Sequence, residues 1–107
     1  MNTIAKRNLT EIKAAILKTV PVEQMYLFGS YAVGKPHKDS DLDIYVVISD
    51  DTPYRATDAI SIIYNAIYDK KTMPVDILVS KKSQFEDRRL GPTIEKEVAA
   101  NGKLLYG

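Results

Sequence analysis

The chain has 107 residues, of which 45% are hydrophobic and 27% are charged, and its formal net charge is +1 at neutral pH. This length predicts one domain over residues 1–107 with a real core and no second lobe. The composition excludes a disordered protein, the balanced charge argues against direct nucleic-acid binding, and the lack of cysteine excludes disulfides, thiolate metal sites and cysteine nucleophiles. No apolar run is long enough to cross a membrane and the polar N-terminus is unlike a signal peptide, so a cytoplasmic protein is expected.

The first half of the chain predicts one helix and two strands. Apolar residues at helical spacing predict a helix over residues 8–19, which ends before Pro21. The short apolar run over residues 25–29 predicts a buried strand that ends at Gly29. A helical turn over 30–34 and a polar loop over 35–40 then lead to a second strand over 41–49.

The second half predicts three further helices and two strands. Thr52 is expected to be the N-cap of a helix that begins at Pro53, and residues 75–80 form a third strand. Ser83 and Glu86 suggest a capping box for a short helix. Residues 93–100 form a last helix, closed by a left-handed cap at 101–102 and followed by a short strand at 103–106. The expected fold is α/β (α+β), a small mixed β-sheet with helices packed on one face.

Two strands carry aspartates where apolar residues alternate with polar ones. In the strand 41–49, Asp41 and Asp43 project from the face opposite the apolar residues, about 6–7 Å apart. At that distance they repel each other by roughly 2–3 kcal/mol at an effective dielectric near 20. Asp76 repeats the pattern in the strand 75–80. If the two strands are neighbours, three carboxylates share one face, which is the arrangement of a two-metal site for phosphoryl or nucleotidyl transfer.

A glycine and a serine precede this pair of aspartates by a short segment. Gly29 allows the backbone to approach a ligand closely, and the turn after it presents free N–H groups suited to phosphate oxygens. The Ser30 hydroxyl adds a donor, and Lys35 or Lys38 can neutralise phosphate charge.

The spacing of these residues resembles a known signature. Gly29-Ser30, ten residues and then Asp41-Leu42-Asp43 are similar to the GS-x(10)-DxD motif of the polymerase-β-like nucleotidyltransferase superfamily. The stretch FGSYAVGKPHKDSDLDIYV resembles its small prokaryotic branch, the MNT-type minimal nucleotidyltransferases, and the similarity runs over nearly the whole chain.

The resemblance implies roles for individual residues. Gly29 and Ser30 would hold a nucleoside triphosphate, Asp41 and Asp43 would bind two Mg²⁺ ions, and Asp76 would ligate the metal on the acceptor side and help activate the acceptor hydroxyl. Several MNT-type proteins carry a basic residue three places after the serine. Val33 stands there in this chain, so Lys35 or Lys38 would substitute for it.

A chain of this size also resembles the antitoxin of HEPN/MNT toxin–antitoxin pairs. Such antitoxins use ATP to attach AMP to a tyrosine of the HEPN toxin, an RNase, which predicts a Mg²⁺-dependent adenylyltransferase that forms a complex with its toxin. Two alternatives remain open at this point. One is a non-catalytic antitoxin that acts by direct binding, and the other is a nucleotidyltransferase for small molecules that needs a partner subunit.

Overall fold

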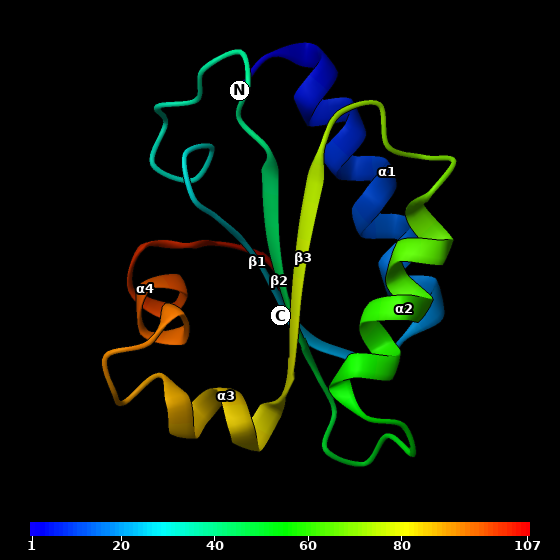
Figure 1. Cartoon of the computed structure of the whole chain (residues 1–107), viewed down its shortest axis with the longest axis vertical. Helices are drawn as coiled ribbons and strands as arrows, with labels where there is room; N and C mark the ends of the chain where they lie inside the picture. The colour runs from blue at the N-terminus through cyan, green and yellow to red at the C-terminus, as the bar shows by residue number, and fades with distance from the viewer.

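The computed structural model describes the whole chain, residues 1–107, and its elements follow the predicted order. The first four elements are the helix α1 (Thr3–Thr19), the strands β1 (Val22–Phe28) and β2 (Leu42–Ile48), and the helix α2 (Ala56–Ile67) (Figure 1). The second half contains β3 (Val75–Lys81), α3 (Lys82–Arg88), α4 (Ile94–Asn101) and β4 (Lys103–Tyr106). The predicted element types are confirmed, and the bounds differ most in α1, which begins at residue 3 rather than 8.

The four strands form one mixed sheet in the order β3-β2-β1-β4. β2 and β3 are parallel, whereas β1 runs antiparallel to both β2 and β4. The parallel pair is joined by a crossover through α2, as parallel strands require. The C-terminal end of β1 and the N-terminal ends of β2 and β3 therefore lie at the same edge of the sheet.

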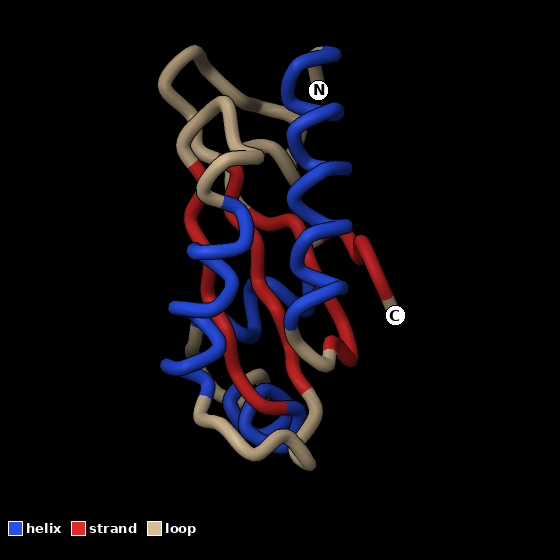
Figure 2. The backbone as a smooth tube through the Cα atoms, turned by 90° about the vertical axis from the view of Figure 1, so that its right-hand side faces the viewer, coloured by secondary structure: helices blue, strands red, loops and turns tan.

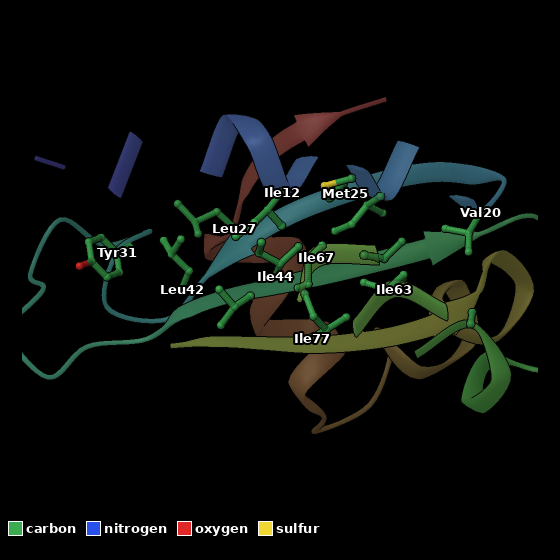
Figure 3. Close-up of a cluster of buried hydrophobic side chains, with 14 of the residues drawn as sticks. Ile12, Val20, Met25, Leu27, Tyr31, Leu42, Ile44, Ile63, Ile67 and Ile77 are labelled. Atoms are coloured by element: carbon green, nitrogen blue, oxygen red, sulfur yellow. The ribbon is translucent and has the colours of Figure 1, made fainter. Parts of the chain in front are cut away.

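The larger core lies between the sheet and the helices α1 and α2, which run side by side over one face (Figure 2). Alternate residues of β2 point into it, as the sequence pattern predicts, because successive side chains of a strand face opposite ways. Figure 3 shows how side chains from α1, α2 and the three long strands meet there. The fully buried β2 residues on this side are Leu42, Ile44, Val46 and Ile48.

The helices α3 and α4 cover the opposite face, so the expectation that the helices pack on one face is wrong for this pair (Figure 1). A second, smaller core lies beneath them, formed by Tyr26, Tyr45, Val47, Phe85 and Val98. Each of the two short helices contributes one fully buried apolar residue, Phe85 from α3 and Val98 from α4. One apolar anchor per helix is too little to produce a periodic pattern in the sequence.

Three predicted helix ends are also wrong. Thr52 is buried before α2, and the helix begins instead at an Arg55 N-cap whose N–H donates to Asp58. Ser83 does not cap α3, because its N–H and hydroxyl both donate to Asp50. Gly102 closes α4 with φ of −71°, so the end is extended rather than left-handed. No helix combines the length and apolarity needed to cross a membrane.

Candidate nucleotidyl-transfer site

Asp41, Asp43 and Asp76 lie at the common edge of the sheet described above. Asp43 and Asp76 are register partners on the parallel strands β2 and β3, and Asp41 immediately precedes β2. A backbone hydrogen bond of 3.0 Å from Leu42 N–H to the Pro74 carbonyl joins the starts of the two strands. Adjacent strands are about 4.8 Å apart, so register partners present neighbouring side chains on the same face.

The electrostatics of Asp43 reflect its burial and the two neighbouring acids. The pKa of Asp43 is raised, first by partial burial, then by the negative charge of Asp76 and then by that of Asp41. Both of these flanking aspartates are exposed to solvent. The site therefore concentrates negative charge around a half-buried carboxylate, where a cation would be favourable.

Gly29 fits closely against the same carboxylate. It has φ of +74°, and a Cβ atom built on it would overlap the Oδ2 atom of Asp43. Only glycine therefore lets the turn and Asp43 approach this closely. The two halves of the signature, ten residues apart in sequence, are in contact through this pair.

The segment after Gly29 forms a compact hydrogen-bonded turn. The Ala32 and Val33 N–H groups donate to the Gly29 carbonyl at 3.1 and 3.3 Å, and the Lys35 N–H donates to the Ser30 carbonyl at 3.0 Å. The Ser30 hydroxyl donates to the buried Ser40 hydroxyl at 3.0 Å. Ser30 is thereby held beside the residue that precedes Asp41.

Lys35 and Lys38 are exposed in the loop that follows, and neither forms an ion pair with a carboxylate. Lys38 lines a shallow hollow with Tyr31 and His37 near the N-terminus of α1. The structure thus brings Gly29, Asp43 and Asp76 together, with Ser30 and Asp41 next to them, and leaves the two lysines free in solvent. Their part in phosphate binding stays a prediction.

Tyr64 is a neighbour of the site that the sequence pattern assigned to the core. It belongs to α2, on the other face of the sheet, and its ring packs against the larger core. Its hydroxyl accepts a hydrogen bond of 2.9 Å from the Ile77 N–H and lies 3.5 Å from the Asp76 Oδ1 atom. Helical spacing alone cannot predict this contact. It depends on the Tyr64 side chain extending past the edge strand β3 to the face that carries Asp76.

The donor set suits a divalent cation, although the side chains are not already gathered into a group of three metal ligands. Carboxylate oxygens are the ligands that Mg²⁺ prefers. Burial and two neighbouring carboxylates raise the pKa of Asp43, so its negative charge is unfavourable in the folded protein. A bound cation would offset this charge. Asp41, Asp43 and Asp76 are the residues that would hold Mg²⁺.

Comparison with known proteins agrees with this geometry. Residues 10–107 match the family model described as polymerase beta, nucleotidyltransferase. The chain belongs to the polymerase β nucleotidyltransferase family. Together with the solved structures described next, this match confirms the resemblance to MNT-type members and the expected polymerase-β-like fold, apart from the placement of α3 and α4. No curated protein matches the sequence at a significant level.

Solved structures of this nucleotidyltransferase fold extend the comparison. A putative nucleotidyltransferase from Sulfolobus solfataricus has 19% identity and a TM-score of 0.57, over 99% of this chain and 88% of that one. A toxin–antitoxin complex with AMP-PNP has 24% identity and a TM-score of 0.58, over 92% of this chain and 72% of that one. A variant of the MntA–HpeT toxin–antitoxin complex with a tyrosine replaced by alanine has 26% identity and a TM-score of 0.57, with the same coverage.

Proposed function

We propose that this nucleotidyltransferase transfers AMP from ATP, with Mg²⁺, to a tyrosine of a partner toxin and so acts as an antitoxin. The observation that carries the proposal is the contact of Gly29 with Asp43 beside Asp76, which joins the turn after β1 to a row of carboxylates. Toxin–antitoxin complexes, one with AMP-PNP, are among the proteins with this fold.

In the proposed reaction, Ser30 and the backbone N–H groups of Ser30 and Tyr31, which make no backbone hydrogen bond in the turn, bind the phosphates of ATP. The acceptor oxygen forms a bond with the α-phosphorus, the bond from that phosphorus to the bridging oxygen breaks, and pyrophosphate leaves. Asp76 helps to remove the proton of the acceptor hydroxyl. Mg²⁺ held by Asp41, Asp43 and Asp76 would supply the positive charge that stabilises the transition state.

A protein acceptor is favoured because the acids lie on an open part of the sheet. Asp41 and Asp76 are exposed, and α3 lies at the opposite end of their strands, directly after β3 (Figure 1). Efficient transfer needs an acceptor that is held in place and a site that excludes water. A partner protein that docks on this face supplies both, and its tyrosine supplies the nucleophile.

The test has two parts. First, calorimetry measures ATP binding in EDTA and in Mg²⁺, and we expect tight binding only with Mg²⁺, because ATP alone adds negative charge to the three aspartates. Second, the protein is incubated with the product of the neighbouring gene and with ATP labelled at the α- or the γ-phosphate. We expect label from the α-phosphate alone to appear on the partner.

Equal ATP affinity with and without Mg²⁺ would contradict the proposal that the reaction depends on Mg²⁺. A stable complex that acquires no label would favour the non-catalytic antitoxin. Label found on a small molecule, with none on the partner, would favour the small-molecule nucleotidyltransferase.

A further inference from the structure

A hollow of about 320 Å³ lies beside the candidate site, between the turn after β1 and the helix α4. Figure 1 shows that this turn and α4 lie on the same side of the sheet. The hollow lies at the lower end of the ~300–1,000 Å³ range that is typical of small-molecule sites. Its lining residues are Phe28, Gly29, Val33, Ile94, Glu97, Asn101 and Gly102.

The hollow continues the row of carboxylates across the sheet. Asp76 on β3 is the register partner of Asp43 on β2, and Asp43 is the register partner of Phe28 on β1. The three side chains therefore stand next to one another on one face, and Phe28 forms the boundary between the acids and the hollow. Gly29 touches both regions, since it contacts Asp43 and lines the hollow.

The chemistry of the lining suits the uncharged part of a nucleotide. Phe28 offers an aromatic ring, and Val33 and Ile94 offer apolar side chains that are 55% and 43% exposed. No cation lines the hollow, and the carboxylate of Glu97 would repel phosphate. Phosphate therefore belongs at the turn and the aspartates, and an aromatic, uncharged group belongs in the hollow.

Two polar side chains at the rim add hydrogen-bond acceptors. The Asn101 amide donates to the Glu97 carboxylate at 2.9 Å, which leaves the Asn101 carbonyl oxygen and a second Glu97 oxygen free to accept. The exocyclic amine of a purine such as adenine is a donor that matches them.

We infer that this hollow binds the nucleobase of the nucleotide whose phosphates occupy the adjacent turn. The inference rests on the proposed function and adds to it the residues that contact and recognise the base. The base lies against Phe28 between Val33 and Ile94, and its amine edge faces Glu97 and Asn101.

The experiment compares two ligands that differ in whether they have a base: ATP and inorganic tripolyphosphate, both with Mg²⁺. Calorimetry on the wild-type protein is expected to show tighter binding of ATP. The double variant Val33→Ala/Ile94→Ala removes apolar contacts from two walls of the hollow, and we expect it to weaken ATP binding about tenfold. Its affinity for tripolyphosphate is expected to stay within about twofold of wild type.

The matched control is Leu90→Ala/Leu104→Ala, which truncates two exposed apolar side chains that do not line the hollow. It should leave both affinities unchanged. Wild-type protein that binds tripolyphosphate as tightly as ATP, or a Val33/Ile94 variant with unchanged ATP affinity, would overturn the inference and leave the proposed function standing. Wild-type protein that binds neither ligand would overturn both.

Discussion

At the scale of single residues, the proposed site depends on two neighbours of Asp43, namely Asp76 and Gly29. The alternation of apolar and polar residues predicts that Asp43 and Asp76 share a face if their strands are neighbours, and the register of β2 with β3 confirms it. The close approach of Gly29 to Asp43 could not be predicted, because it joins two segments through a turn whose path has no periodic pattern. The Phe28 and Tyr64 contacts were missed for the same reason.

Replacing Asp43 by asparagine should separate stability from activity. We expect AMP transfer to fall by about a hundredfold or more, since a charge that stabilises the transition state is lost. The pKa of Asp43 is raised in the folded state, so its ionisation destabilises the fold at neutral pH, and this penalty disappears as the pH falls through the folded-state pKa. Thermal denaturation should therefore show Asp43→Asn melting above wild type at pH 7, with a gap that closes in acid. An unchanged or lower melting temperature at pH 7 would contradict an unfavourable Asp43 charge in the folded state.

Gly29 and Gly34 offer a matched pair of substitutions. Both have φ of +74°, but a Cβ on Gly29 meets Asp43 whereas a Cβ on Gly34 meets nothing within 4 Å. Alanine at either position should cost about 1–2 kcal/mol of stability because of the left-handed backbone. Only Gly29→Ala should also abolish Mg²⁺-ATP binding, as measured by calorimetry. Normal binding by Gly29→Ala, or its loss in both variants, would contradict the role given to the Gly29–Asp43 contact.

At the scale of elements, α4 and α2 support the site from opposite faces of the sheet. Burial of α4 rests on Val98 and on a hydrogen bond of 2.7 Å from the Tyr45 hydroxyl to the buried Glu95 carboxylate. The Glu95 carboxylate also lies 3.5 Å from the Arg88 guanidinium. The sequence predicted both helices, but a glutamate in a short helix gives no sign that it faces inward, so the second helical layer was missed.

Removing the Tyr45 hydroxyl tests the attachment of α4. Tyr45→Phe leaves a buried Glu95 oxygen without its donor, and we expect a loss of about 1–3 kcal/mol in the free energy of unfolding, measured with urea. Glu95→Gln can still accept from Tyr45, so it serves as the comparison. In a double-mutant cycle, Tyr45→Phe and Glu95→Ala should be non-additive, because each of them removes the bond. Strict additivity would show that the bond contributes no coupling.

The Tyr64 hydroxyl provides the corresponding test on α2. Tyr64→Phe removes the group that lies between the Ile77 N–H and Asp76, so Asp76 loses a neighbour that restricts its orientation. We expect kcat for transfer to fall several-fold while ATP affinity stays near wild type, since Asp76 serves the acceptor. Tyr68→Phe, at the C-cap residue of α2, which is 79% exposed, is the control and should change neither value. A parallel loss of ATP affinity in Tyr64→Phe would indicate a general structural effect.

At the scale of the whole molecule, the sheet separates two kinds of surface. One face is covered along its length by α1 and α2 (Figure 2). The other is covered only in part by α3 and α4, and its remaining part carries the aspartates and the hollow beside them. Sequence periodicity predicted the covered face well, because long amphipathic helices have strong patterns. The shape of the open face depends on how two short helices pack, which periodicity does not encode.

Intact-mass spectrometry of the partner shows directly whether AMP is transferred at this site. The chain is co-expressed with the product of its neighbouring gene, and the partner is recovered after incubation with Mg²⁺-ATP. We predict that the partner gains the mass of one or more AMP units at a tyrosine, and that Asp43→Asn abolishes the gain while the complex still forms. A partner that binds stably but keeps its unmodified mass, or gains AMP equally with Asp43→Asn, would contradict nucleotidyl transfer at this site.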